Sequence, residues 1–368
     1  MEFFRKILHH ILVLINLLFA FLLLISNLSV FISPEKFWPI AFFGLAFPYL
    51  LLINIFFIIF WTVRWRRMVL VSIIVILAGW YNLAAYIQIP INPFQFFKSK
   101  NQKECILKIM QYNVRDFSKT NDLPIIKSQP DILKIIKSEN PDIVCFQEFR
   151  IEPDGYTFGK ILKTLKPSRY FYSYYNYSNE SGSGIAIFSK YPIIAKGKMS
   201  FGNTCNITMF SDIVVKKDTI RLFNCHLQSI RFLKGDYDFI DSIQFSTSEK
   251  NKAGIKTISY KLREAFKLRA YQVDHISKLI DKSPYPIILC GDFNDTPVSY
   301  TYKRMKGNLC DAFRESGRGI GNTYNGKVPH FRIDYIFHSR KFGSFGYKMR
   351  HEDYSDHFPV FCKICIKK

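Results

Sequence analysis

The first 90 residues differ from the rest of the chain in their pattern of apolar and polar positions. Three apolar stretches, Ile7–Ile32, Phe37–Trp61 and Met68–Ile89, each reach the roughly 20 residues that are needed to cross a bilayer core. A cleaved signal peptide would explain the first stretch but not the other two. The pattern therefore predicts that residues 1–90 form an anchor of three transmembrane helices.

Three asparagines interrupt the first two stretches. Asn16, Asn27 and Asn54 are strongly polar side chains within otherwise apolar sequence. Buried amides can form hydrogen bonds from one membrane helix to another, which satisfies groups that hydrocarbon cannot. We expect these side chains to face neighbouring helices.

Basic residues indicate which way the anchor is oriented. Arg5 and Lys6 precede the first stretch, and residues 64–67 between the second and third contain three arginines, whereas residues 33–36 are nearly neutral. Basic loops favour the cytoplasmic side of a membrane. The third helix would then exit on the extracytoplasmic side. We predict an integral membrane protein whose second part lies in the periplasm or at the outer face of the cytoplasmic membrane.

After a short linker, residues 91–104, the pattern changes to short strand-like runs separated by turns. Helical spacing is found at 125–138 and 259–279. Strands interspersed with helices predict one domain over residues 105–368, a sandwich of two β-sheets covered by helices. The clearest strands are ILKIMQYNV, DIVCFQEF, SGIAIFSK, TIRLFNCHL, PIILCGDFN, RIDYIFHS and PVFCKICI.

Residues 229–259 have no clear period and mix both signs of charge. A loop of this length is either a mobile cover over a site or partly disordered. A cover is slightly favoured because the segment directly follows His226. Residues 170–177 are rich in tyrosine, which could stack on bases or enter headgroups, or simply form a strand and turn.

The charge balance changes the list of expected partners. The net charge is +22, and residues 1–100 contain eight Lys/Arg and two Asp/Glu, so +6 lies there and +16 in the remainder. A basic domain suits nucleic acid, anionic lipid headgroups or phosphorylated metabolites. The same net charge is also expected of a solvated basic surface that aids solubility and binds no partner.

The eight cysteines all follow residue 104 and show no pair of CxxC motifs at zinc spacing. Cys145, Cys225 and Cys290 stand inside strand-like runs beside branched and aromatic residues. These cysteines are interpreted as small buried apolar side chains.

Most of the informative polar residues share one setting, the C-terminal end of an apolar strand; Asp334 lies within a strand, and Asp356 and His357 stand just before one. Hydrolysis of a phosphoester needs a hard cation on oxygen ligands, an oriented water, and donors for the charge on phosphorus and the leaving oxygen. A single carboxylate after a strand is usually a turn residue, but this set contains groups of every kind. Its members are Asn113, Glu148, His226, Asp292, Asn294, Asp334, Asp356 and His357.

The order of motifs resembles the endonuclease/exonuclease/phosphatase family, the superfamily of DNase I, over essentially all of 105–368. Each motif alone is weak evidence for the resemblance, but all seven motifs in the family's order are very specific evidence. The resemblance implies an α+β, DNase I-like four-layered sandwich of two sheets flanked by helices, here preceded by the three transmembrane helices. The motifs are QYNV, FQEF, SGSGIAIFSKYP, NCHL, CGDFND, IDYIF and SDHFPV.

The resemblance also implies roles for these positions. Glu148 corresponds to the principal metal ligand, and Asn113 and Asp356 complete or support the metal site. Asp292 corresponds to the carboxylate that orients or deprotonates the attacking water. Asn294 would donate hydrogen bonds to the phosphoryl oxygens.

Histidines complete the catalytic set that the resemblance implies. His357 would contact the scissile phosphate and be oriented by Asp334 through its other ring nitrogen. His226 stands where abasic-site endonucleases carry tyrosine, which argues against abasic-site repair. Three residues could support the substrate or be ordinary surface-helix and turn residues: Arg269, Gln272 and Thr323.

Oxygen ligands without thiolates or clustered histidines favour Mg²⁺, with Mn²⁺ as a substitute. The expected partners are an anionic phosphoester and the lipid bilayer, with no obligate protein partner. Three hypotheses remain open: a phosphoesterase acting on a lipid-linked phosphate, a membrane-tethered nuclease, and a catalytically inactive binding or scaffold module. The complete set of site residues argues against the third.

Overall fold

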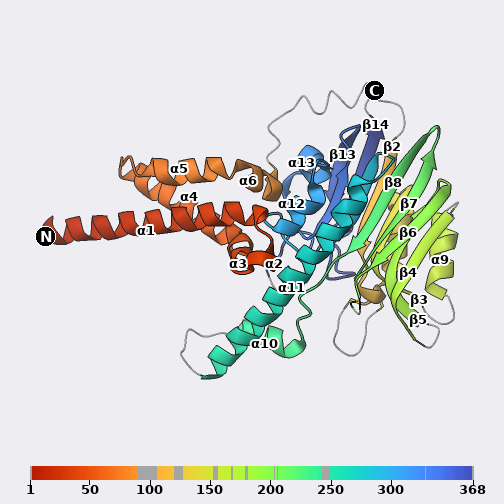
Figure 1. Ribbon diagram of the computed structural model, residues 1–368, viewed down its shortest axis with the longest axis horizontal. Coiled ribbons are helices and arrows are strands. Elements are labelled where there is room, and N and C mark those ends of the chain that lie inside the picture. The colour runs from red at the N-terminus through yellow and green to blue at the C-terminus, as the bar shows by residue number, and fades with distance from the viewer. Residues whose placement is uncertain are drawn as a thin grey trace.

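The computed structural model describes most of the chain, and the structural statements below refer to those residues. The N-terminal helices project from one side of a two-sheet sandwich (Figure 1). The predicted linker, residues 91–104, lies outside the described residues. The described ranges are 2–88, 106–119, 127–151, 156–166, 169–178, 181–202, 204, 206–242, 249–327 and 329–366.

The anchor has one helix that is long and apolar enough to cross a membrane, where the sequence predicted three. The second and third predicted spans are each a pair of helices, bent by 57° and 73°. Pro48 at the start of α4 lacks a backbone N–H, and Gly79 ends α5, which explains both breaks. The helices are α1 (Glu2–Leu28), η1 (Ser29–Phe31), α2 (Pro34–Phe37), α3 (Pro39–Leu45), α4 (Phe47–Val63), α5 (Val69–Ala78) and α6 (Trp80–Tyr86).

The asparagines of the anchor bond between helices, as the sequence predicts. Asn16 Nδ2 donates to Ser72 Oγ at 2.8 Å, and Ser72 Oγ donates to Asn54 Oδ1 at 3.0 Å. Asn27 Oδ1 accepts from Asn82 Nδ2 at 2.9 Å. These bonds join α1, α4, α5 and α6 into one bundle and leave the amides buried.

The second part of the chain contains two six-stranded sheets. All seven predicted strands are present, and four further strands of eight to ten residues, Arg169–Ser178, Ile193–Ser200, Ile207–Val215 and Phe342–Met349, were not predicted. One sheet has the order β13 (Phe342–Met349), β14 (Val360–Ile366), β2 (Ile106–Asn113), β3 (Ile143–Ile151), β5 (Ser181–Ser189), β4 (Arg169–Ser178). The other has the order β10 (Cys310–Asp311), β12 (Asp334–His338), β9 (Ile287–Asp292), β8 (Asp218–His226), β7 (Ile207–Val215), β6 (Ile193–Ser200).

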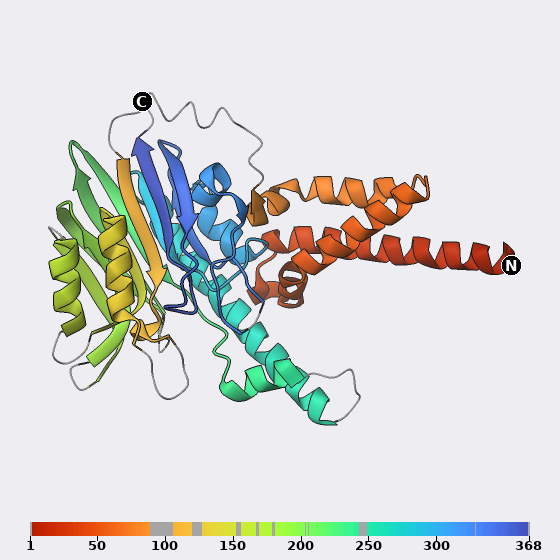
Figure 2. The same cartoon turned by 180° about the vertical axis from the view of Figure 1, so that it is seen from behind.

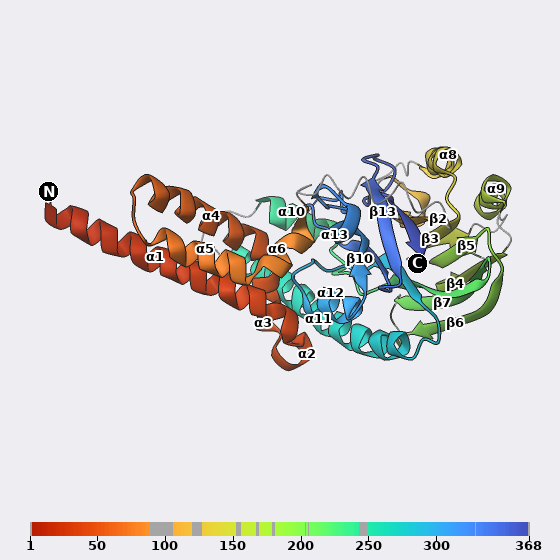
Figure 3. The same ribbon diagram turned by 90° about the horizontal axis from the view of Figure 1, so that it is seen from above.

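Helices cover the outer face of each sheet, so the predicted sandwich of two sheets flanked by helices is confirmed. Figure 3 shows α8 (Gln129–Glu139) and α9 (Tyr156–Leu165) on one side of the sheets, with α11 (Glu249–Asp281) and α12 (Tyr300–Lys306) on the other. The tyrosine-rich segment forms β4, and its side chains from residue 172 onward lie outside the described set.

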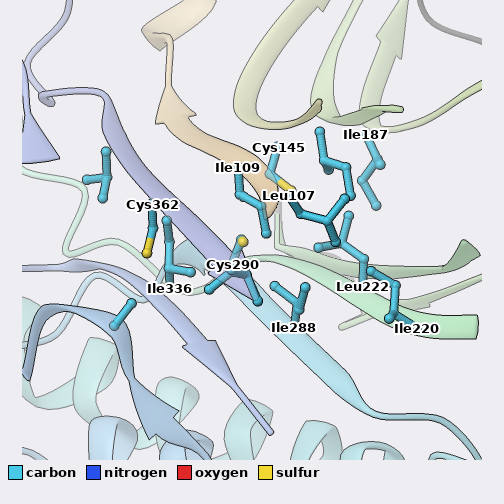
Figure 4. Packing of buried hydrophobic residues seen from close by; sticks show 14 of the residues in the cluster. Leu107, Ile109, Cys145, Ile187, Ile220, Leu222, Ile288, Cys290, Ile336 and Cys362 are labelled. Carbon is cyan, nitrogen blue, oxygen red and sulfur yellow. The ribbon is translucent and has the colours of Figure 1, made fainter. Parts of the chain in front are cut away.

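The apolar core between the sheets explains why the strands alternate as they do. Ile109, Ile187, Leu222 and Ile288 point from both sheets into one cluster (Figure 4). The three cysteines singled out in the sequence are fully buried and unpaired, which confirms that they act as small apolar side chains.

The segment 229–259 is more ordered than the sequence suggested. Instead of a loop, it contains α10 (Lys234–Ser242) and the first third of α11, which begins at Glu249 rather than near Ser259. The two helices bury few side chains against each other, so the sequence shows no clear helical period. Their contact is close at Gly254, where a Cβ would overlap the Phe239 ring. Residues 243–248 lie outside the described set.

The anchor packs directly on the sandwich. Val298, which follows β9, lies in one apolar cluster with Phe47, Leu50 and Tyr86. A Cβ at Gly44 would lie 2.4 Å from the Val298 carbonyl oxygen, so only glycine allows this approach. The N-terminal helices are therefore part of the same folded body and not a loose tether.

A buried arginine completes this junction. Arg332 is fully buried, and its guanidinium donates to the carbonyl oxygen of Ala85 at 3.0 Å and to Asp311 at 2.5 Å. The two-residue strands β1 (Ile87–Gln88) and β11 (Gly319–Ile320) pair antiparallel beside it. One side chain thus bonds to the anchor and to the second sheet.

We expect Arg332→Met to destabilise the protein by about 3–5 kcal/mol, because it leaves the buried Asp311 carboxylate without its cation. Chemical denaturation of the full chain, followed by circular dichroism, measures this loss. The control is Arg340→Met at an exposed arginine, for which a change within about 0.5 kcal/mol is expected. Equal stability of the two variants would contradict the role given to Arg332.

Candidate active site

Two pairs of parallel strands, one in each sheet, bring the predicted residues to one edge of the sandwich. Asn113 ends β2 and is paired with Gln147 of β3, and His226 of β8 is paired with Asp292 of β9. Because parallel strands end at the same edge, Asn113 and Glu148 of one sheet face His226 and Asp292 of the other.

A β-bulge in β3 places Glu148 in the site. The register of β3 on β5 shifts between Phe146 and Phe149, and Glu148 has φ 47°. The bulge lets Phe146 and Phe149 both pack under α8 and α9, while Gln147 and Glu148 turn toward the other sheet. A left-handed φ is uncommon and energetically unfavourable for a non-glycine residue, and it occurs most often where the backbone must direct a side chain into a functional site.

The amide of Asn113 links the two central carboxylates. Its Nδ2 donates to Glu148 Oε1 at 3.1 Å and to Asp292 Oδ2 at 3.0 Å. His226 Nε2 lies 3.5 Å from Glu148 Oε1 and 3.9 Å from Asp292 Oδ2. These four side chains therefore converge on one small volume.

His357 and Asp334 form the predicted pair. His357 Nδ1 lies 2.8 Å from Asp334 Oδ2, which leaves Nε2 directed at Asp292 Oδ2 at 3.7 Å. Burial alone would lower the pKa of His357, but Asp334 and Asp292 more than offset it and raise that pKa well above the usual value. The imidazole is therefore a cation at neutral pH, with one N–H facing the site.

A chain of buried amides holds Asp334 in place, and sequence analysis missed it. Gln111 Nε2 donates to Asp334 Oδ1 at 2.8 Å and to Gln147 Oε1 at 2.7 Å, and Gln147 Nε2 donates to Asn224 Oδ1 at 2.6 Å. All three amides are buried between the sheets. The signal was available, since each is an amide side chain within a mainly apolar strand, one or two positions before a site residue.

The crowded carboxylates titrate above their ordinary range. Burial, with the nearby Asp356 carboxylate adding to it, raises the pKa of Glu148 to about 7. Burial also raises the pKa of Asp292 to about 6, although the neighbouring His357 opposes this shift. Burial lowers the pKa of His226, so this ring is neutral beside the cationic His357.

The donors around Glu148 fit a hard divalent cation. Glu148 and Asp356 keep side-chain exposures of 32% and 24%, so their oxygens are open to the site, and Asn113 adds an amide. A cation stabilises ionised carboxylates that lie close together, as a proton on Glu148 would. Asp292, Asp334 and His357 also offer ligand atoms within 4.8 Å of one another, but the last two are bonded to each other.

The remaining predicted residues lie behind the site and are buried, not exposed helix and turn residues. Arg269 Nη1 donates to the carbonyl oxygen of Gln228, and Gln272 Oε1 accepts from the Gln228 backbone N–H, so both brace the segment after His226. Thr323 Oγ1 accepts from the backbone N–H groups of residues 333 and 334. All three act on the backbone beside the site.

Asn294 lies at the rim of the site with φ 53°. Its Nδ2 donates to the carbonyl oxygen of Leu227 at 3.0 Å, and its backbone N–H donates to Asp292 Oδ1 at 2.8 Å. Asn294 thus joins the turns after β8 and β9 and fixes the carboxylate of Asp292.

Two further side chains at the site were not predicted. The Tyr324 ring lies edge-on to His357, with 5.4 Å between the ring centres. Arg115 Nε lies 3.6 Å from Asp356 Oδ2 and brings a cation to the mouth of the site. Tyr324 lies outside the predicted strands, and Arg115 directly follows the predicted strand ILKIMQYNV but was not selected with Asn113.

The sandwich and the site define a DNase I-like protein of the nuclease and phosphatase type. Residues 110–357 match the sequence model of the endonuclease/exonuclease/phosphatase family, which is more than half of the chain. The chain therefore belongs to this family. Residues 9–86 match a domain of unknown function (DUF8431).

The chain is similar to an exodeoxyribonuclease of Bacillus subtilis (strain 168), with 27% identity over 207 residues that cover 56% of this chain and 66% of the relative. The match thus spans just under two thirds of that protein. Two solved structures share the fold. An endonuclease/exonuclease/phosphatase from Beutenbergia cavernae DSM 12333 is 16% identical in sequence, with a TM-score of 0.51, and the match covers 71% of this chain and 72% of that one. The human Nocturnin catalytic domain with a bound sulfate anion is 18% identical, with a TM-score of 0.50, and the match covers 71% of this chain and 95% of that one.

We expect Mg²⁺ to raise the unfolding temperature more at about pH 8 than at about pH 6. The raised pKa of Glu148 means that the folded protein binds this proton more tightly than the unfolded chain does. The contribution of that proton to the free energy of unfolding is lost as pH rises from about 4 toward about 7. Mg²⁺ bound to the ionised carboxylate would then supply the lost stability.

Scanning calorimetry of the full chain in nanodiscs, with and without Mg²⁺, measures the shift. Glu148→Gln should lose most of it, while Asp218→Asn, at an exposed aspartate, should retain it. A Glu148→Gln variant that still responds to Mg²⁺ like the parent would place the cation elsewhere.

Proposed function

We propose that the protein is a membrane-anchored, Mg²⁺-dependent phosphoester hydrolase, in which water attacks phosphorus. The substrate is a phosphodiester or phosphomonoester of nucleic acid or of a lipid-linked phosphate. The convergence of Asn113, Glu148, His226 and Asp292 from two sheets supports this proposal most directly. An inactive scaffold would not need to keep this set complete.

Asp292 acts on the attacking water. Its Oδ1 is fixed by the Asn294 backbone N–H, and its Oδ2 lies within 4 Å of both site histidines. With a pKa of about 6, the carboxylate is mostly ionised at neutral pH but still able to accept a proton.

The histidines act on the phosphate. Protonated His357 donates its Nε2 hydrogen to a phosphoryl oxygen, and Asp334 keeps the ring in place and charged. Neutral His226 adds one donor or acceptor, and Asn294 has a second amide hydrogen that can reach the same oxygens.

Glu148 would hold the cation, supported by Asn113 and Asp356, and Mn²⁺ would replace Mg²⁺. When bound, the cation supplies positive charge that stabilises the phosphoryl oxygens. The guanidinium of Arg115, 3.6 Å from Asp356 Oδ2, partly offsets the negative charge of this carboxylate.

The anchor is proposed to cross the membrane three times, with the two bent pairs each counted as one span. The positions of basic residues then place the catalytic domain on the extracytoplasmic side. Holding the site at a bilayer suits a lipid-linked phosphate, and the domain charge of +16 also suits nucleic acid.

We expect Asp292→Ala and His357→Ala each to lower kcat on bis-p-nitrophenyl phosphate by at least about 10²-fold, because each removes a proton-transfer or charge-stabilising group. The assay uses the full chain in nanodiscs with Mg²⁺. Asp218→Ala and His275→Ala, which lie outside the site, are the controls and should leave the rate unchanged. Activity retained in either site variant would refute the assignment.

The proposed orientation predicts that protease added to intact cells degrades the C-terminal domain. A tag placed after residue 368 and detected by immunoblot reports this. The same blot after cell lysis serves as the positive control. A domain that is shielded until lysis would contradict the extracytoplasmic placement.

A further inference from the structure

The helical arm formed by α10 and residues 249–262 of α11 leaves the sandwich and carries an unusual surface. One face of α11 is covered by α10: the Phe239 ring lies against Gly254, and Lys261 pairs with Asp236. At 100° per residue, positions 254 and 261 share this face with position 258. The opposite face of α11 is not covered by α10.

That opposite face is the one that meets the anchor. Arg263 lies over the Trp38 ring at 5.5 Å, and Phe266 packs edge-on against Phe42 at 5.3 Å. Trp38 stands in the turn between α2 and α3, where the chain passes from the first apolar segment to the second. Tryptophan at such a turn is typical of the headgroup region of a membrane.

Helical geometry extends this face toward the free end of the arm. Lys252 and Lys256 lie within about 20° of Arg263 around the helix axis, and Ile255 borders them. Both lysines are exposed, and Ile255 and Tyr260 keep 49% and 59% of their surface exposed. Exposed apolar and aromatic side chains beside lysines are the composition of an interfacial membrane helix.

The direction of the arm is set by the packed junction. Figures 1 and 2 both show α10 and the N-terminal part of α11 leaving the sheets and sloping back toward the side on which α1, α4 and α5 lie. From Arg263 to Lys252 the helix continues for about 16 Å at 1.5 Å per residue. The arm therefore runs from the contact with Trp38 toward the bilayer and not away from it.

We propose that this face of α11 contacts the headgroup region of the bilayer that holds the anchor, with a preference for anionic lipid. The proposal rests on the membrane anchoring proposed above. Ile255 and Tyr260 supply the apolar contact, and Lys252 and Lys256 supply the attraction to anionic headgroups.

The arm also begins close to the site. The chain leaves β8 at His226 and enters α10 at Lys234, so the segment between them joins the site edge to the arm. Contact of the arm with lipid holds this edge near the bilayer surface. Phosphoesters at that surface are then the substrates that the site reaches first.

Lipid proximity tests the proposal without any assay of hydrolysis. An environment-sensitive fluorescent amino acid is introduced by amber suppression at Ile255, in the full chain, in nanodiscs that contain phosphatidylglycerol and spin-labelled lipid. Ile194 on β6 is the matched control, an isoleucine that is 59% exposed. We expect strong quenching at position 255 and little at position 194.

A third position separates failure of the arm from failure of the anchor. Phe56 lies within α4 and is 59% exposed, so a fluorophore there reports the anchor itself. Quenching at 56 with none at 255 would overturn the arm contact alone. No quenching at either position would overturn the arm contact together with the anchoring on which it rests.

The preference for anionic lipid has its own test. Lys252→Glu with Lys256→Glu should weaken quenching at 255 about twofold, because each lysine near an anionic surface contributes attraction. Lys137→Glu with Lys217→Glu, at exposed lysines on the sandwich, should leave it unchanged. An equal response of both pairs would refute the charge preference.

Discussion

The buried guanidinium of Arg332 joins the N-terminal helices to the sheet that carries half of the site. It bonds to Ala85 at the end of α6 and to Asp311 at the edge of the second sheet, with no exposed surface of its own. Asp334, which orients His357, follows only two residues later. A buried charge tolerates little displacement, because separating it from its partner is costly. The position of the anchor is thereby fixed relative to the site.

The site itself depends on contact between the two sheets. Glu148 and Asn113 come from one sheet, whereas Asp292 and His226 come from the other, and the buried amides of Gln111, Gln147 and Asn224 cross the gap between them. Removing one of these amides would leave the buried groups bonded to it without their partner, which is costly. The same bonds that hold the sheets in register also hold the carboxylates and histidines of the site together, which explains why so many polar groups lie in an otherwise apolar core.

Much of this arrangement could be predicted from sequence, because apolar runs followed by Asn, Glu, Asp or His are local patterns. The bulge that aims Glu148 could not, since it depends on how β3 pairs with β5. Pro48 and Gly79 are helix-breaking residues that indicate the bends, but the uniformly apolar sequence around them favoured continuous helices. Burial of Arg269 and Gln272 arises from packing of α11 on the second sheet, which no single segment encodes. The side of the membrane and the substrate stay predictions.

The N-terminal helices and the sandwich form one folded body, joined at Val298 and Arg332. Comparing the thermal unfolding of isolated residues 105–368 with that of the full chain in nanodiscs tests whether this junction stabilises the sandwich. Removing the anchor exposes the apolar cluster around Val298 and takes from Arg332 its bond to Ala85. The isolated domain should unfold at a clearly lower temperature than the same domain in the full chain. Identical unfolding temperatures would show that the anchor is only a tether.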